Sequence, residues 1–155
     1  MLQIRIFSST LLFLFLYPIA FGQQLPKKAN KLVGTWSYVN NKGFEVWEKS
    51  KNPNELTGTG YLISDNGDTT KHENLRLTYN GTRLVYYATV YNQNQGKEIA
   101  FQSKGKKFFF ENPSHDFPRA IRYKFNCLNR KKLDVYLFHP HKNKLPLKIS
   151  LVKTE

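Results

Sequence analysis

The chain has 155 residues, is 15% aromatic and carries a formal net charge of +13 at neutral pH. This length suffices for one domain with a hydrophobic core and is too short for two. The single cysteine excludes an internal disulfide. The positive charge comes without a recognition motif, so nucleic acid is not an expected partner. The scattered lysines indicate a basic surface that can make weak electrostatic contact with anionic envelope surfaces.

Residues 1–22 have the pattern of a cleaved secretory signal peptide. Arg5 precedes an apolar run over residues 11–19, and Ala20-Phe21-Gly22 supplies small residues of the kind that a signal peptidase reads. The run is too short to cross a bilayer. We expect cleavage after Gly22, so that residues 23–155 form one secreted or periplasmic domain. Because no cysteine follows the run directly, a lipoprotein anchor is not expected.

The rest of the chain is patterned almost entirely as β-strands. Alternating apolar and polar residues, separated by turn signals such as Asn80-Gly81, predict ten of them. The predicted ranges are 34–39, 43–49, 56–64, 69–79, 82–91, 98–103, 106–111, 119–127, 132–139 and 147–153. Residues 25–32 form a short helical or irregular segment before them. Strands that follow one another closely, joined by tight turns, are typical of an antiparallel meander.

Each strand presents one apolar and one polar face. In residues 119–127, for example, Ile121 and Tyr123 alternate with Arg122 and Lys124. Because almost no helix is available as cover, the sheet must close on itself or pack on a second sheet, and closure also removes exposed edges. We therefore predict an all-β fold, an antiparallel up-and-down β-barrel of eight to ten strands that encloses one small ligand. Cys127 falls on the apolar face, which predicts a buried, inert thiol.

Two carboxylates fall on faces that are predicted to be interior. Glu45 shares a face with Trp47, and Glu73 shares one with Leu75. A buried carboxylate is costly unless it has a partner or faces a wet cavity, so these residues predict a cavity with a polar floor. The alternative is a register shift or bulge that turns both carboxylates outward. Candidate polar neighbours in the cavity are Arg119, His115 and four tyrosines, Tyr86, Tyr87, Tyr91 and Tyr123.

Residues 110–123, FENPSHDFPRAIRY, form a turn between two strands that is stiffened by Pro113 and Pro118. Between the prolines lie His115, which titrates near neutrality, and Asp116. A His–carboxylate pair can support acid–base catalysis. Adjacent residues of an extended chain point to opposite faces, however, so these two touch only if the turn is bent.

The same turn also has an architectural interpretation. The prolines fix the backbone, and Asn112 and Asp116 form local hydrogen bonds with it. Phe117 then plugs the end of the barrel. This interpretation is compatible with a ligand site elsewhere in the cavity.

Several motifs together resemble a known family. Leu32-Val33-Gly34-Thr35-Trp36 resembles the opening G-x-W of lipocalin-like (calycin) barrels, in which the Trp closes one barrel end. The motifs that follow look like those of an exported bacterial family placed among these barrels, a domain of unknown function with the signature F-x-N-P-x-H-D-F-P-x-x-I-x-Y. The signature is matched at Phe110, Asn112, Pro113, His115, Asp116, Phe117, Pro118, Ile121 and Tyr123. The resemblance covers residues 32–137 and implies a lipocalin-like fold without an assigned activity.

We therefore predict an exported binding protein for a small, largely apolar molecule held in the barrel. Predicted ligand-binding residues are Glu45, Trp47, Glu73, His115 and Tyr123, and the predicted structural signature is Trp36, Asn112, Pro113, Asp116, Phe117 and Pro118. One alternative is an enzyme in the same cavity, with His115 and an interior Glu as the acid–base pair. Another is a surface protein whose barrel is filled by its own aromatic side chains. The sequence leaves the oligomeric state open.

No metal or cofactor is predicted. His139-Pro140-His141 has a spacing that can chelate a transition metal, but we interpret it as an exposed pair in a Lys-rich loop. The resemblance also implies a haem alternative, since some calycin-like barrels hold haem through a single axial His. His115 is the candidate ligand for it, and no second sequence feature supports haem.

Overall fold

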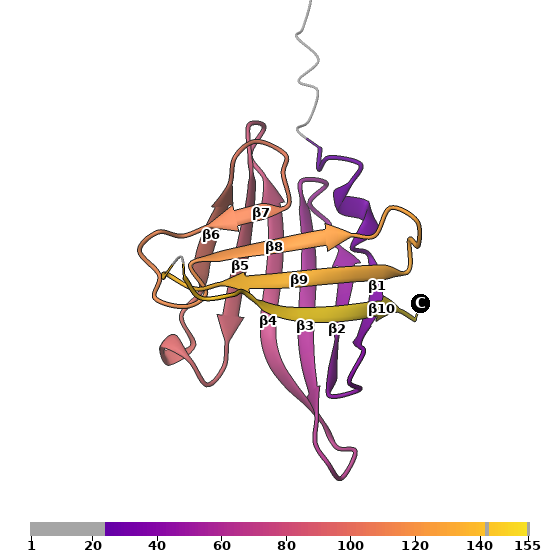
Figure 1. The fold of residues 1–155 in the computed structure, drawn as a ribbon. Coiled ribbons are helices and arrows are strands. Elements are labelled where there is room, and N and C mark those ends of the chain that lie inside the picture. Colours follow the sequence, from indigo (N-terminus) through magenta and orange to yellow (C-terminus); the bar gives the residue numbers. More distant parts are fainter. Residues whose placement is uncertain (1–23, 142, 155) are drawn as a thin grey trace, which may run out of the picture.

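The structure, a computed structural model, describes residues 24–141 and 143–154 (Figure 1). The predicted signal peptide, residues 1–22, therefore lies outside the described residues. The elements are η1 (Ala29–Lys31), β1 (Gly34–Tyr38), β2 (Gly43–Lys49), β3 (Glu55–Ile63), β4 (Thr69–Tyr79), β5 (Leu84–Val90), η2 (Asn94–Gly96), β6 (Ile99–Ser103), β7 (Phe109–Glu111), β8 (Ala120–Phe125), β9 (Lys132–Phe138) and β10 (Leu147–Lys153). Within the described residues, neither helical segment is long and apolar enough to cross a membrane.

The strands close into an antiparallel up-and-down barrel. Each strand pairs with the next along the chain, and β10 returns to pair with β1, with Trp36 opposite Lys153. The prediction of an all-β barrel of eight to ten strands is confirmed, at ten. The alternation of apolar and polar residues in the sequence fits this fold because interior and exterior side chains alternate along every strand of a closed barrel.

One end of the barrel is closed by the segment that precedes β1. Ala29 and Leu32 are buried there, and the buried Trp36 indole N–H donates a hydrogen bond to the Leu32 carbonyl at 2.6 Å. The Lys153 ammonium lies over the Trp36 ring, 5.4 Å from its centroid. We refer to this end as the closed end. The opposite end, here called the mouth, carries the β1–β2, β3–β4, β5–β6, β7–β8 and β9–β10 connections, which lie along the bottom and the left of Figure 1.

Aromatic side chains fill the middle of the barrel and the part towards the closed end. Tyr86 packs against Phe101, Phe110 and Tyr123, with ring centroids 6.3, 5.4 and 5.8 Å away. The Trp47 ring lies over Gly58 of β3, where a Cβ atom would come within 2.9 Å of the indole. A glycine is therefore needed beneath Trp47, and the buried aromatic layer forms the inner boundary of the space that opens at the mouth.

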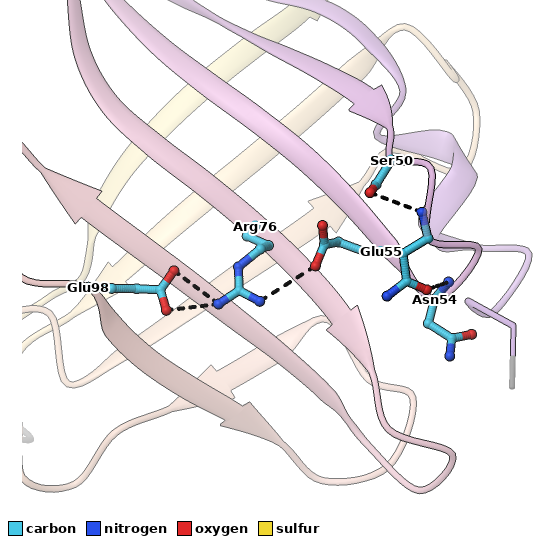
Figure 2. A network of polar contacts seen from close by, with 6 residues as sticks. Ser50, Asn54, Glu55, Arg76 and Glu98 are labelled. Atoms are coloured by element: carbon cyan, nitrogen blue, oxygen red, sulfur yellow. Dashed lines mark hydrogen bonds and ion pairs between the residues drawn. The ribbon is translucent and has the colours of Figure 1, made fainter.

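The outer surface of the barrel carries a polar network centred on Arg76 (Figure 2). Its guanidinium donates to both oxygens of Glu98 at 2.8 and 3.0 Å, and it reaches Glu55 at 3.5 Å. The same group stacks over Tyr87 at 3.9 Å. Nearby, the Ser50 hydroxyl accepts a hydrogen bond from the backbone of Asn52 in the β2–β3 turn. These contacts link β3 and β4 to the start of β6 without entering the barrel.

The prediction that Cys127 is buried is wrong. β8 ends at Phe125, and the Asn126 side chain accepts hydrogen bonds from the backbone N–H groups of Leu128 and Asn129 at 2.9 and 2.8 Å. These bonds replace the next ladder bonds and turn the chain away from the sheet. Cys127 is consequently exposed.

Candidate ligand cavity

A cavity of about 320 Å³ extends from the mouth into the barrel. Its walls are apolar and come from strands on one side of the mouth, with Val90, Ile99, Ile121, Val135, Leu137 and Ile149 among the lining residues. Its polar lining residues come from β1, β2, β4, β5, β8 and the β5–β6 and β7–β8 connections and are Tyr38, Glu45, His72, Glu73, Tyr86, Gln93, Asn94, His115 and Tyr123. The cavity thus combines apolar walls with several polar groups, two of which are carboxyl groups.

Glu45 is buried and has defined partners. Its Oε2 atom accepts a hydrogen bond from the Trp47 indole N–H at 2.8 Å and one from the Tyr123 hydroxyl at 3.4 Å. The Tyr86 hydroxyl lies 3.3 Å from that of Tyr123 and extends the chain of contacts. Burial raises the pKa of Glu45, while the two donated hydrogen bonds oppose the increase. Trp47 does not line the cavity and acts on it by holding the Glu45 carboxylate.

Glu73 lies two strands away from Glu45 on the same interior row. Gly60 of β3 pairs with Glu45 on one side and with Glu73 on the other. Within the described part of the chain, the Glu73 carboxylate has neither an ion-pair nor a hydrogen-bond partner. Burial, followed by repulsion from Glu45, raises the pKa of Glu73 from 4.5 to about 8. This raised pKa favours the protonated form of Glu73 at neutral pH.

A β-bulge brings a further residue to the cavity. Gly60 pairs with Glu73 and Tyr61 pairs with Lys71, so His72 is the extra residue of β4. Both His72 and Glu73 line the cavity as a result. A register shift or bulge could instead have turned both carboxylates outward. The bulge is present, and both Glu45 and Glu73 face the cavity.

The tyrosines of the cavity are neutral groups. Burial and the two nearby carboxylates raise the pKa values of Tyr86 and Tyr38, and the pKa of Tyr123 is raised mainly by burial and Glu45. They offer hydroxyl groups and ring faces to a ligand. Of the other candidate tyrosines, Tyr87 lies on the outer surface beneath Arg76, and Tyr91 is exposed.

His115 lines the cavity near the mouth. Its Nδ1 atom lies 2.9 Å from the Pro118 carbonyl oxygen, and its ring packs edge-on against Phe101 at 5.6 Å. Because a carbonyl only accepts, Nδ1 carries a proton and donates it to Pro118. Nε2 is buried and has no hydrogen-bond partner among the described residues.

Asp116, by contrast, points away from the cavity. Its side chain is 93% exposed, and Oδ1 accepts a hydrogen bond from the Phe117 backbone N–H at 2.7 Å. That hydrogen bond lowers the pKa of Asp116, with a smaller contribution from His115. The carboxylate lies 3.7 Å from His115 Nδ1, the nitrogen already committed to Pro118. Asp116 therefore shapes the turn and has no contact with the space that a ligand would occupy.

The remaining signature residues hold the β7–β8 connection. The Asn112 amide donates to the Ala100 carbonyl at 3.0 Å, and its side-chain oxygen accepts from the Ser114 backbone at 3.1 Å. Phe117 lines the mouth and stacks on His139 at 4.4 Å. Pro118 lines the cavity, whereas Pro113 is exposed outside it.

The structure thus brings Glu45, Glu73, His115 and Tyr123 to one cavity and places Trp47 behind Glu45. Arg119, considered as a partner for the carboxylates, is exposed and lies outside the lining. Sequence reasoning did not identify Tyr38, although it lies two positions after Trp36 and alternation therefore places both on the interior face. Within residues 24–141 and 143–154, no group of three or more His, Cys, Asp or Glu side chains is arranged to hold a metal ion.

Exposed apolar side chains gather around the mouth. They come from the mouth connections and from the strand ends next to them, and include Val39, Leu62, Tyr91, Phe117, Leu145 and Leu147. Leu128, in the β8–β9 connection, is exposed at the other end of the barrel, so six of the seven large apolar residues exposed on the described surface lie around the mouth.

No protein-family model matches the sequence, and no curated protein is similar enough to count as a match. The resemblance to an exported lipocalin-like family accordingly stays a prediction at the level of the family, while the barrel itself is established by the structure.

Proposed function

We propose that the protein is an exported binding protein that holds a small, largely apolar molecule in the barrel cavity. The observation that carries this proposal is a cavity of about 320 Å³ open at the mouth and bounded inside by packed aromatic residues. Ligand pockets usually measure about 300–1,000 Å³, so the ligand is small. The apolar walls favour an apolar body, and the buried polar groups orient one polar end of it.

The cavity supports a carrier better than a filled barrel. Trp36, Trp47, Phe101 and Phe110 occupy the barrel interior at full burial. The residues nearer the mouth are smaller or lie against the walls, among them Ala88, Val90 and Ile99. Aromatic filling thus accounts for the closed part of the barrel and leaves the part near the mouth open.

An acid–base enzyme is the second candidate function, because His115 and Glu73 line the same cavity. His115 presents a buried Nε2 atom without a hydrogen-bond partner among the described residues, and Glu73, with a pKa of about 8, can exchange a proton near neutral pH. Such an enzyme would convert a bound molecule, and the conversion would stop in His115→Ala. Asp116 is not its catalytic partner, since it points to solvent.

Export and envelope contact belong to the proposal as well. Export rests on residues 1–22, and an intact mass that begins at Gln23 in the exported protein would support it. Contact with anionic surfaces rests on the excess of Lys and Arg over Asp and Glu and would be recognised by release from the envelope at high salt.

The proposal is tested by native mass spectrometry of protein purified from its own host. A bound small molecule should appear in the native spectrum and be absent after denaturation. Ala88→Phe, which adds a ring inside the cavity, should remove it, whereas Ala100→Phe on the outer face of neighbouring β6 should not. Protein that is empty in the wild type and in Ala100→Phe would contradict the carrier proposal.

A further inference from the structure

The charge inside the barrel is opposite to that of the whole chain. The sequence has 24 Lys and Arg residues against 11 Asp and Glu. Yet the described residues that line the cavity include Glu45 and Glu73 and no Lys or Arg. Every Lys or Arg salt bridge within the described residues involves carboxylates outside the cavity, as Arg76 does with Glu55 and Glu98. Among the residues that the structure describes, this basic protein thus places two carboxyl groups in the cavity with no Lys or Arg beside them.

The positions of the two carboxylates are fixed by specific neighbouring residues. Glu45 is only 6% exposed and is fixed by hydrogen bonds from Trp47 and Tyr123 to one of its oxygens. Both donors stabilise the ionised form of that carboxyl group. Gly60 leaves the space in which the Glu73 side chain lies, because a Cβ atom there would come within 2.7 Å of Glu73 Oε1.

Two aromatic rings, those of Tyr86 and Tyr123, line the same space. The Trp47 ring packs behind them, 6.3 Å from that of Tyr86 and 6.4 Å from that of Tyr123, tilted to the first and edge-on to the second. Ring faces attract a cation by about 0.5–2 kcal/mol, and more strongly where water is excluded. Neutral tyrosine hydroxyls additionally accept hydrogen bonds from an ammonium group.

We propose that the ligand is a small organic amine whose protonated nitrogen lies between Glu45 and Glu73, beside Tyr86 and Tyr123, with its apolar body against the walls towards the mouth. This assignment rests on the proposed binding function and specifies its ligand class. A cavity of 320 Å³ equals about ten water molecules at about 30 Å³ each. An amine with a single ring and a short chain therefore fits the space.

The binding of such an amine depends on pH in a defined direction. Glu73 loses its proton when the ammonium binds, so binding releases a proton below about pH 8 and tightens as the pH rises towards that value. The amine stays protonated to about pH 10, by analogy with lysine. The titratable groups that face Glu73 from the surrounding elements are Tyr38 on β1, Glu45 on β2, His72 on β4, Tyr86 on β5, Tyr123 on β8 and His115 in the β7–β8 connection.

The test is calorimetric titration of the purified protein at pH 8 with 2-phenylethylamine, 2-phenylethanol and 3-phenylpropanoate. These probes share a ring and a short chain and differ in the charge of the polar end. We expect the amine to bind about tenfold or more tightly than the alcohol, and the carboxylate to bind most weakly. Binding of the amine should weaken between pH 8 and pH 6, while binding of the alcohol should stay constant.

Variants show which carboxyl group is responsible for the preference for the amine. Glu73→Gln should cut the affinity for the amine about tenfold and leave that for the alcohol within about twofold. Glu98→Gln, which removes an acidic group from the outer surface, should change neither. Equal binding of amine and alcohol to the wild type would overturn the amine assignment and leave the carrier proposal intact. Binding of none of the three probes would overturn the amine assignment, and a wild-type native spectrum without a co-purifying molecule would separately overturn the carrier. The comparison of probes needs no variant, so it stands even if Glu73→Gln fails to fold.

Discussion

The Glu73 side chain occupies the space above Gly60 on the neighbouring strand. A Cβ atom at Gly60 would lie 2.6 Å from Glu73 Cγ and 2.7 Å from Oε1, closer than real contacts allow. Gly60 also pairs with Glu45 on its other side. A residue without a side chain thus separates the two cavity carboxylates and gives one of them its position.

Gly60→Ala is therefore expected to displace the Glu73 carboxylate. The side chain is flexible and can move, so we expect a loss of about 1–3 kcal/mol in the free energy of unfolding, typical of overpacking. Binding of 2-phenylethylamine should weaken in parallel. Urea denaturation measures the first quantity and calorimetry the second.

The double variant Gly60→Ala/Glu73→Ala provides the control. With the Glu73 side chain removed, the new methyl group has room, and the two substitutions should couple favourably by about 0.5–3 kcal/mol. If the losses in the free energy of unfolding of the two single variants simply add up in the double variant, the contact between these two positions does not limit stability.

The stability of the barrel should depend on pH through Glu73. Its pKa is raised in the folded state from 4.5 to about 8, so the folded protein binds more protons than the unfolded chain between these values. The stabilising contribution of this proton is complete below pH 4.5 and is lost as the pH rises to about 8. Burial raises the pKa of Glu45 as well, which adds in the same direction.

Glu73→Gln isolates this effect, because glutamine cannot ionise. Its free energy of unfolding relative to wild type should increase between pH 5 and pH 8, on the order of 3–4 kcal/mol in total. Denaturation at pH 5, 6.5 and 8 provides the comparison. A constant difference across that range would mean that Glu73 titrates as an exposed carboxyl group does.

His115 and Asp116 should behave differently although they are neighbours. His115→Ala removes the hydrogen bond to Pro118 and the packing on Phe101, and should cost about 1–2 kcal/mol of stability. Asp116→Ala should leave ligand binding unchanged, because the carboxylate is exposed and turned away from the cavity. Thermal unfolding measures the stability of the two variants, and calorimetry measures their ligand binding. A loss of binding confined to Asp116→Ala would show that Asp116, and not His115, contributes to the ligand site.

Trp36 should be essential to the closed end. Trp36→Ala is expected to lose about 3–5 kcal/mol, whereas Trp36→Phe keeps a ring and leaves the Leu32 carbonyl unpaired, at about 1–3 kcal/mol. The sequence contains two tryptophans. Trp36→Phe therefore leaves Trp47 as the sole indole, hydrogen-bonded to Glu45, and its fluorescence should change when a ligand reaches that carboxylate. Trp36→Ala with the stability of wild type would contradict this role.

The alternation of apolar and polar residues predicted the barrel because, in each strand, it identifies which side chains face the interior and which face solvent. β4 and β10 have the predicted bounds, and the faces of Glu45 and Glu73 follow from Trp47 and Leu75 beside them. Alternation fails where a strand stops being regular. Cys127 lies beyond the end of β8, where the Asn126 turn cancels the period, and His72 joins Glu73 at the cavity because of a bulge.

The partners of the cavity groups could not be predicted, since they come from strands far apart in sequence. The hydrogen bond between Tyr123 and Glu45 spans 78 positions, and the contact between Tyr86 and Tyr123 spans 37. Such pairs depend on the number of strands and on the stagger with which the barrel closes. The pattern of apolar and polar residues within a single strand determines neither the number of strands nor the stagger.

Both ends of the described chain lie at the closed end of the barrel. The Thr154 backbone N–H donates to the Thr35 carbonyl at 2.9 Å, and the Leu25 N–H reaches Pro53 in the β2–β3 turn. An affinity tag, fluorophore or surface tether attached at either end would therefore point away from the mouth. Protein immobilised in this way would present its opening to solution, which suits it to capture of small molecules from mixtures on a sensor surface.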